Sequence, residues 1–135
     1  MTFAQTVGKF SEDRAAEYLI SIGWIILGRN VRNELGEIDI AAIDTNVNEL
    51  VIIEVRARTF GKIQTPLESV GTKKLNTLIK SSRLFIESCE WEGFWRIDVI
   101  GITFNKKIDI DHLQNNHDWK LEHVKDITGG FDMFS

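Results

Sequence analysis

The sequence predicts an α/β domain in which a mixed β-sheet is flanked by helices, with the elements in the order α-β-β-β-α-β-β. Two observations predict this class. Capping signals precede two segments of helical periodicity, and alternating or continuous apolar runs lie between and after those segments. A chain of 135 residues also suits one domain better than two. We therefore expect a single domain over residues 1–128 and a frayed tail over residues 129–135.

The first helix is expected from about residue 3 to residue 22. Thr2 and Gln5 have the spacing of a capping box, and Gly23 supplies a terminator. Glu12 is followed at helical spacings by the apolar residues Ala15, Ala16, Leu19 and Ile22. The sequence therefore predicts that the Glu12 carboxylate lies on the inward face of this helix.

Three strands are expected after this helix. The first covers residues 24–27, with an extension to residue 31 left open, and a turn follows at residues 33–36. The second covers residues 37–43. Alternation places Ile38, Ile40 and Ala42 on one of its faces and Glu37, Asp39, Ala41 and Ile43 on the other.

The third strand is expected at residues 50–58, after a polar loop that reverses the chain. One face carries Leu50, Ile52, Glu54, Arg56 and Arg58. Both faces begin with apolar residues, so we expect this strand to be central in the sheet.

The second helix is expected from about residue 65 to residue 88. Thr65, Pro66 and Glu68 match the N-cap, first and third positions of a helix. A long strand is then expected at residues 94–104, and a last strand at residues 107–112 or 119–124.

Composition limits the functional classes. The net charge of −4 argues against indiscriminate coating of nucleic acid, which is driven by Lys and Arg. Cys89 is the one cysteine, which excludes an internal disulfide and favours a reducing compartment. The first ten residues lack a signal-peptide pattern, and no apolar run is long enough to cross a membrane. We therefore expect a cytoplasmic protein without a membrane partner.

The hairpin between the second and third strands brings two carboxylates together. If Ile43 pairs with Leu50, continuing the register pairs Ala41 with Ile52, Asp39 with Glu54 and Glu37 with Arg56. Like charges placed opposite each other are destabilising, so Asp39 and Glu54 need a reason to be there. Mg²⁺ is one such reason, because it prefers oxygen ligands and commonly takes one or two carboxylates. Solvation, or ion pairs with the neighbouring arginines, is the alternative.

A divalent cation at Asp39 and Glu54 would polarise a phosphoryl oxygen and activate a water. Arg56, on the same face, could hold a phosphate oxygen through its guanidinium fork. Glu12 could act as an outer ligand or orient the attacking water. His112, His117 and His123 do not have metal-ligand spacings with the cysteine, and we expect surface or hydrogen-bonding roles for them.

A set of motifs occurs in a fixed order along the chain: Gly8-x-x-x-Glu12, Tyr18-Leu19, Gly23, Asn30-x-Arg32, Gly36-Glu37-Ile38-Asp39-Ile40-Ala41, Glu54-Val55-Arg56-x-Arg58, Lys73 and Arg96-x-Asp98-Val99. The set resembles the YraN-type family of small proteins, which is similar to archaeal Holliday junction resolvases of the PD-(D/E)XK nuclease superfamily. The resemblance implies a restriction-endonuclease-like core in which Asp39 and Glu54 bind Mg²⁺ or Mn²⁺ and Glu12 supports the site. It also implies a homodimer, because junction-resolving enzymes act in pairs.

Arg56 is the chief departure from the superfamily pattern, which most often has lysine at that position. Arginine stays protonated and cannot act as a general base. Three alternatives remain open: the metal-activated water needs no side-chain base, Lys73 reaches the site from the second helix, or hydrolysis is slow or absent.

The sequence therefore predicts a Mg²⁺- or Mn²⁺-dependent endonuclease that hydrolyses phosphodiesters of nucleic acid, with branched or structured DNA as the expected substrate. The catalytic residues would be Glu12, Asp39, Glu54 and Arg56, and the candidate contacts to the nucleic-acid backbone are Arg32, Arg58, Lys73 and Lys74. A catalytically inactive module that binds nucleic acid or a protein is the competing hypothesis. A purely structural protein is the third.

Overall fold

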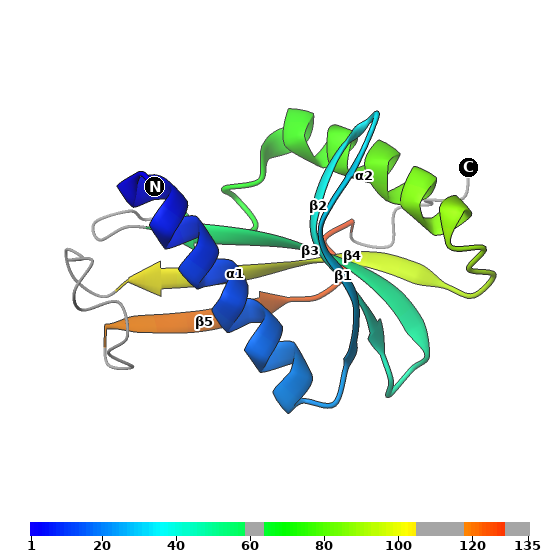
Figure 1. The fold of residues 1–135 in the computed structure, drawn as a ribbon, viewed down its shortest axis with the longest axis horizontal. Helices are drawn as coiled ribbons and strands as arrows, with labels where there is room; N and C mark the ends of the chain where they lie inside the picture. The colour runs from blue at the N-terminus through cyan, green and yellow to red at the C-terminus, as the bar shows by residue number, and fades with distance from the viewer. Residues whose placement is uncertain (59–63, 105–117, 129–135) are drawn as a thin grey trace.

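A five-stranded mixed sheet forms the centre of the molecule in the computed structural model, which describes residues 1–58, 64–104 and 118–128 (Figure 1). The elements are α1 (Phe3–Ser21), β1 (Ile25–Asn33), β2 (Gly36–Asp44), β3 (Glu49–Arg58), α2 (Gly71–Ser88), β4 (Trp95–Phe104) and β5 (Trp119–Val124). The strand order is β1-β2-β3-β4-β5, with β3 and β4 parallel and the other neighbours antiparallel. The predicted α/β class and element order are confirmed.

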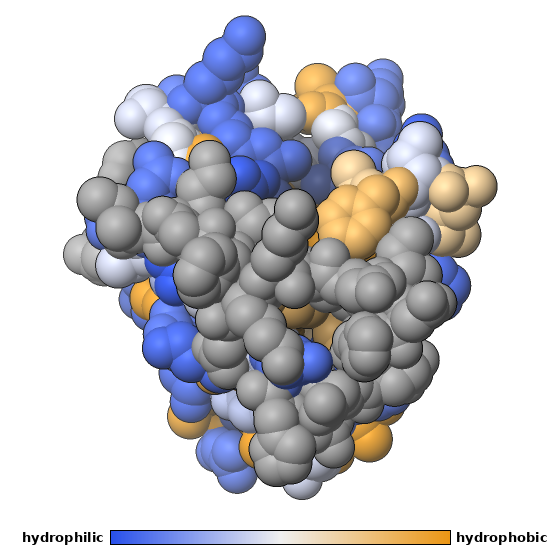
Figure 2. All heavy atoms as spheres, turned by 90° about the vertical axis from the view of Figure 1, so that its left-hand side faces the viewer, coloured by the Kyte–Doolittle hydropathy of each residue, from blue (hydrophilic) through white to orange (hydrophobic). Residues whose placement is uncertain are grey.

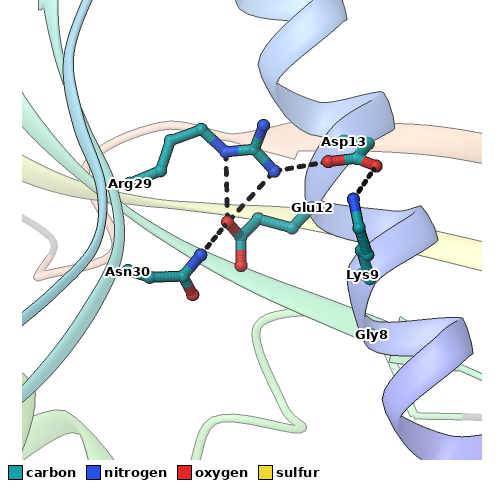
Figure 3. Close-up of a pocket in the computed structure, with 6 residues that line it drawn as sticks. All are labelled: Gly8, Lys9, Glu12, Asp13, Arg29 and Asn30. Carbon is teal, nitrogen blue, oxygen red and sulfur yellow. Dashed lines mark hydrogen bonds and ion pairs between the residues drawn. The ribbon is translucent and has the colours of Figure 1, made fainter. Parts of the chain in front are cut away.

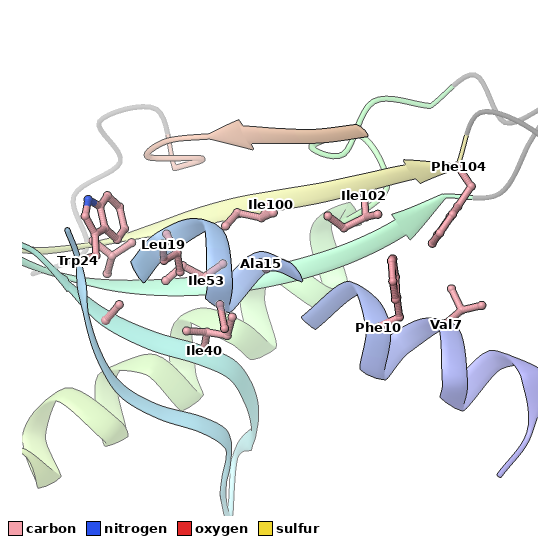
Figure 4. Packing of buried hydrophobic residues seen from close by; sticks show 13 residues of the cluster. Val7, Phe10, Ala15, Leu19, Trp24, Ile40, Ile53, Ile100, Ile102 and Phe104 are labelled. Atoms are coloured by element: carbon pink, nitrogen blue, oxygen red, sulfur yellow. The ribbon is translucent and has the colours of Figure 1, made fainter. Parts of the chain in front are cut away.

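The two helices cover opposite faces of the sheet (Figure 1). Val51 and Ile53 of β3 pack in the cluster that contains α1, whereas Leu50 and Ile52 pack in the cluster that contains α2. Figure 4 shows the first cluster, where α1 lies across β2, β3 and β4. All four of these β3 side chains are fully buried, as expected of a central strand.

Helix α1 begins at the predicted capping box. The Gln5 N–H donates to Thr2 Oγ1 at 3.1 Å, and the Thr2 N–H donates to Gln5 Oε1 at 2.9 Å. Two of the orphan N–H groups at the start of the helix are thereby satisfied. Gly23, just beyond the helix, has a φ of +88°, which glycine adopts without the steric cost that a Cβ brings.

The second helix starts later than predicted. The capping box of Thr65 and Glu68 does form, with N–H···O distances of 3.2 and 3.1 Å, but residues 66–70 make only a turn. Gly71 has a φ of +70°, a left-handed conformation that interrupts the helical path, and α2 begins there. Gly101 of β4 allows this turn to lie on the sheet, because a Cβ at that position would overlap the Pro66 ring.

The β1–β2 hairpin separates from the rest of the sheet and bends towards α2 (Figure 1). The β2–β3 ladder ends at Ile40 and Ile53, beyond which β2 pairs only with β1. Asn33 Nδ2, near the hairpin tip, donates to the Ser81 carbonyl of α2 at 3.0 Å. Ile38 consequently packs with α2, so the prediction that it shares a face with Ile40 is wrong. Strict alternation fails here because β2 twists where it leaves β3.

Strand β5 matches the second of the two predicted positions for the last strand. The other position, at residues 107–112, lies outside the described residues, as do His112, His117 and the predicted tail at 129–135. Within the described residues, neither helix is long and apolar enough to cross a membrane. On the face where β3 and β4 end, the described hydrophilic and hydrophobic side chains are interspersed (Figure 2).

Candidate functional site

The site is built where β2 separates from β3. The predicted register is confirmed for Ile43 with Leu50 and for Ala41 with Ile52. The ladder ends at Ile40 with Ile53, so the predicted ladder pairing of Asp39 with Glu54 does not form. Instead, Asp39, the residue before Ile40, accepts the Val55 N–H of β3 at its Oδ2, at 2.9 Å. The Asp39 carboxylate thus takes the place of a strand carbonyl and is held against β3.

The predicted pairing of Glu37 with Arg56 does not form. Glu37 lies opposite Arg32 of β1, with the Arg32 Nε 3.8 Å from its Oε1. This part of β2 is already in the separated hairpin. The Arg32 side chain is 81% exposed, so it lies at the surface of the hairpin.

Glu54 is the buried acid of the pair. Its Oε1 lies 3.6 Å from Lys74 Nζ and 3.7 Å from Arg56 Nη1. Its Oε2 is buried and accepts no hydrogen bond from a donor among the described residues, although a protonated Glu54 carboxyl can donate a hydrogen bond to Asp39. Burial of an unsatisfied acceptor costs free energy, so this oxygen is suited to a ligand that the protein does not itself supply.

The two carboxyl groups affect each other's ionisation. Burial, followed by the charge of Asp39, raises the pKa of Glu54 to about 7, against the opposing effect of Lys74 and Arg56. Burial also raises the pKa of Asp39, although the hydrogen bond from the Val55 N–H opposes this. At neutral pH both groups therefore resist carrying full negative charge together.

These residues fit a divalent cation. Asp39 and Glu54 supply hard oxygen donors, one of which is a buried oxygen without a partner. No group of three or more His, Cys, Asp or Glu side chains is arranged to hold a metal within the described residues. Two carboxylates are nevertheless the number that Mg²⁺ commonly takes from a protein, with waters and substrate oxygens completing its octahedron.

Arg56 is fixed by the turn that precedes α2. Its Nε donates to Ser69 Oγ at 3.1 Å, and its Nη2 donates to the Ser69 carbonyl at 3.0 Å. The Ser69 hydroxyl in turn donates to the Pro66 carbonyl at 2.6 Å. One edge of the guanidinium is therefore used for anchoring, and Nη1 is the nitrogen directed towards Glu54. The sequence analysis did not find Ser69, because this contact depends on the fold of the turn.

Lys74, and not Lys73, is the lysine that reaches the carboxylates. The sequence contained a signal for this, since Lys74 precedes the buried Leu78 by four residues and so shares its side of α2. Lys73 is exposed. Arg58, a predicted phosphate contact, is instead largely buried and donates to Thr103 Oγ1 at 2.8 and 3.2 Å.

Glu12 is the third acid that was predicted for the site, and it lies on α1. Its side chain is 12% exposed, and its Oε1 accepts from Arg29 Nε at 3.1 Å and from Asn30 Nδ2 at 2.9 Å (Figure 3). Burial raises the pKa of Glu12 despite the Arg29 guanidinium, and the charge of Asp39 adds to the increase. The Glu12 carboxyl is therefore within electrostatic range of the pair, as the helical pattern predicted for an inward-facing acid.

A second polar cluster was missed by the sequence analysis. Asp98 of β4 is fully buried and contacts His123 Nε2 at 2.8 Å and Arg96 Nε at 3.0 Å. Tyr18 of α1 contacts the other His123 ring nitrogen at 2.9 Å, so the cluster connects α1, β4 and β5. The hydrogen-bonding role expected for His123 is confirmed. An aspartate within an almost continuous apolar strand was the available signal.

The fold and this geometry define a class of α/β protein in which a mixed sheet carries a buried carboxylate pair flanked by cations. Within that class, the chain belongs to the UPF0102 family, whose model matches residues 11–102 and is described as "Uncharacterised protein family UPF0102". The matched segment includes Glu12, Asp39, Glu54 and Arg56.

Similar proteins occur in distant bacteria. A UPF0102 protein of Sulfurihydrogenibium sp. is 39% identical over 109 residues, covering 80% of this chain and 90% of its own length. A UPF0102 protein of Persephonella marina is 38% identical, with 86% and 97% covered. One from Clostridium botulinum (strain 657) is 38% identical, with 85% and 89% covered. The similarity therefore extends over nearly the full length of these relatives.

Proposed function

We propose that the protein is a metal-dependent endonuclease that hydrolyses phosphodiester bonds of DNA, with Mg²⁺ or Mn²⁺ held by Asp39 and Glu54. The observation that carries this proposal is the Glu54 carboxylate. Its Oε2 is buried without a hydrogen-bond donor among the described residues, beside a second carboxylate that is fixed by the Val55 N–H. This costly arrangement is understandable if a cation completes it.

When bound, the divalent cation would supply Lewis-acid stabilisation of the charge that develops on the phosphoryl oxygens. Asp39 and Glu54 would hold it. Arg56 presents Nη1 to one phosphate oxygen while Ser69 keeps the guanidinium oriented. Lys74 offsets the negative charge of Glu54 from the α2 side. Preorganised charges of this kind require no rearrangement when the reaction occurs.

We assign Glu12 as the general base that accepts a proton from the attacking water. Arg29 and Asn30 fix its Oε1, and its raised pKa makes the carboxylate a better proton acceptor than an exposed glutamate. The water oxygen bonds to phosphorus, its proton passes to Glu12, the bond from phosphorus to one ester oxygen breaks, and the departing alkoxide takes a proton from solvent water. Arg56 has no part in this proton transfer, so arginine at this position is compatible with turnover.

Two features support DNA as the substrate: the resemblance to junction resolvases and the exposed lysines of α2. The similarity to archaeal Holliday junction resolvases supports branched DNA and a paired arrangement of subunits. Lys73 and Lys80 are exposed on α2, on the helix that also brings Lys74 to the site. Such contacts give shape recognition of the phosphate backbone more readily than base readout.

The test is cleavage of labelled linear, flapped and four-way DNA in Mn²⁺ by the wild type and by Glu54→Gln. We expect cleavage of at least one branched substrate and loss of about a hundredfold or more in the variant, the scale of an important electrostatic group. Glu87→Gln, an exposed glutamate at the other end of α2, is the matched control and should cleave normally. Equal cleavage by Glu54→Gln, or none by the wild type, contradicts the proposal.

A non-catalytic module that binds nucleic acid or a protein partner is the second candidate, favoured by Arg56 in place of lysine. Calorimetry separates the two. An endonuclease of the proposed type takes up Mn²⁺, and Asp39→Ala loses that uptake. If the protein is a module without a metal site, neither the wild type nor Asp39→Ala takes up Mn²⁺, and both still retain labelled four-way DNA at low salt.

A further inference from the structure

Gly8 occupies a helical position that no contact among the described residues explains. It lies in the interior of α1, where glycine is the least favourable residue apart from proline. A Cβ placed on Gly8 would meet no atom within 4 Å, so close packing does not require glycine. A glycine beside open space is expected where another molecule approaches the backbone closely.

The open space beside Gly8 is a pocket of about 580 Å³ between α1 and β1 (Figure 3). Its lining residues are Gly8, Lys9, Glu12, Asp13, Arg29 and Asn30. Asn30, which also lines the pocket, has a φ of +50°. This left-handed backbone conformation costs free energy in residues other than glycine. The volume lies in the range of roughly 300–1,000 Å³ that is usual for pockets that bind small molecules.

The charges of the pocket neutralise one another. Arg29 lies 2.6 Å from Asp13 and 3.1 Å from Glu12, and Lys9 Nζ lies 2.9 Å from Asp13. A phosphate would have to compete with these acids for both cations. A neutral group with donors and acceptors of its own, such as a sugar or a base, meets a complementary mixture of donors and acceptors instead.

The pocket adjoins the carboxylate pair, because Asn30, which lines it, lies on β1 opposite Asp39 of β2, between the ladder pairs Arg29 with Ile40 and Val31 with Ile38. We propose that the pocket binds the sugar and base of one nucleotide of the DNA strand, next to the phosphate held at Asp39 and Glu54, with the sugar lying against the helix backbone at Gly8. This inference rests on the proposed function for the identity of the strand. It adds a nucleotide subsite to the proposed active site.

Titration of the ¹⁵N-labelled protein with 2′-deoxyadenosine, without metal, tests the subsite directly. We expect saturable shifts of the Gly8, Lys9 and Asn30 amide signals, and no comparable shifts with inorganic phosphate. Gly8→Leu should weaken nucleoside binding about tenfold or more, because the side chain fills the space while leucine is a good helix former. Gly8→Ala should give a smaller loss and serves as a second variant if the leucine disturbs the fold.

Glu17→Leu is the matched control. It places the same side chain on the opposite side of α1, nine residues along the helix, where the glutamate is exposed. The control should bind the nucleoside as the wild type does. Absence of shifts at the pocket, shifts with phosphate instead of nucleoside, or equal binding by both Gly8 variants and the wild type overturns the inference.

Cleavage assays on the same proteins keep this inference separate from the proposed function. If the wild type binds the nucleoside but cleaves no DNA and takes up no Mn²⁺, the subsite stands and the nuclease proposal fails. If the wild type cleaves DNA and Gly8→Leu cleaves it equally well, the nuclease proposal stands and the subsite fails.

Discussion

Lys74 Nζ lies 3.6 Å from Glu54 Oε1, while Oε2 of the same carboxylate is buried without a hydrogen-bond donor in the part of the chain that the structure describes. The two oxygens of one side chain are thus in different surroundings. Lys74 and Arg56 approach the first oxygen from two different segments, and their charges oppose the effect of burial on the Glu54 pKa. The second oxygen is available to a cation. The same buried carboxylate therefore influences both the stability of the protein and its expected chemistry.

Glu54→Gln should stabilise the metal-free protein at alkaline pH. The folded-state pKa of Glu54 is raised from 4.5 to about 7, so the folded state favours the protonated carboxyl. The stability that this proton provides is fully present below pH 4.5 and is lost as the pH rises through 7. Glutamine mimics the protonated form at every pH. We expect the variant to be more stable than the wild type by about 3.5 kcal/mol above pH 8, because each pH unit between 4.5 and 7 contributes about 1.4 kcal/mol.

Urea unfolding at acidic and alkaline pH, in the presence of a chelator, measures this difference. The stabilisation should shrink towards zero below pH 4.5, where the wild-type carboxyl is protonated in both states. A difference that is independent of pH would show that Glu54 is not the titrating group.

Mn²⁺ should raise the midpoint of thermal unfolding of the wild type in a concentration-dependent manner. A cation that binds only the folded state stabilises it by about 2.7 kcal/mol when present at a hundredfold excess over Kd. Asp39→Asn and Glu54→Gln should each lose most of this increase, because each removes one of the paired carboxylates. Glu87→Gln keeps both and should respond as the wild type does. An equal increase in all four proteins would indicate binding elsewhere.

The sequence predicts the carboxylate pair because the relevant information is local. A short polar loop between two apolar strands sets the hairpin register, and Ile43 and Leu50 pair as expected. The contact that fixes Asp39 is of a different kind. It forms because the ladder ends and the Val55 N–H becomes available, and this depends on how the whole hairpin twists.

The cations around the pair are less predictable for a related reason. Lys74 reaches Glu54 because α2 begins at Gly71, and Ser69 reaches Arg56 because the preceding turn packs on the sheet. Helix periodicity places Lys74 on the side of the buried Leu78, but it does not show that this side of α2 reaches Glu54. These contacts join segments whose relative position is decided by tertiary packing.

Ser69→Ala should lower the rate of DNA cleavage while leaving substrate binding nearly unchanged. The variant removes the hydroxyl that accepts from Arg56 Nε, although the carbonyl contact to Nη2 remains. Arg56 would then be less well oriented, and a loss of tenfold or so in kcat with a small change in KM is expected of a positioning residue. Ser69→Thr retains the hydroxyl and should recover most of the rate. A loss confined to KM would instead assign Ser69 to substrate binding.

Asp98→Asn should destabilise the protein strongly at neutral pH. Burial opposes ionisation of Asp98, but hydrogen bonds from His123, Arg96 and the Asp126 N–H hold its pKa below 3.8. The carboxylate therefore contributes stability above pH 3.8 that is lost as the pH falls through the folded-state pKa. Removing one partner of a buried ion pair costs about 3–5 kcal/mol.

Urea unfolding of Asp98→Asn should show this loss at neutral pH and a smaller loss in acid. Glu90→Gln, an exposed acid in the segment between α2 and β4, is the control and should change stability little. A loss of equal size at both pH values would mean that the charge of Asp98 is not what holds the cluster together.

Gly101→Ala should reduce both stability and cleavage through the turn that carries Ser69. The new Cβ would overlap the Pro66 ring, so the turn must move off β4, and Ser69 moves with it away from Arg56. Overpacking of this kind costs about 1–3 kcal/mol.

Pro66→Gly tests this explanation. The change removes the ring and leaves the Cα 3.7 Å from the new methyl group, an ordinary contact. The double variant should therefore be more stable and more active than the sum of the single changes predicts, with a coupling energy of about 0.5–3 kcal/mol in urea unfolding. If the two changes are simply additive, the turn does not rest on Gly101, and another contact must hold Ser69 against Arg56.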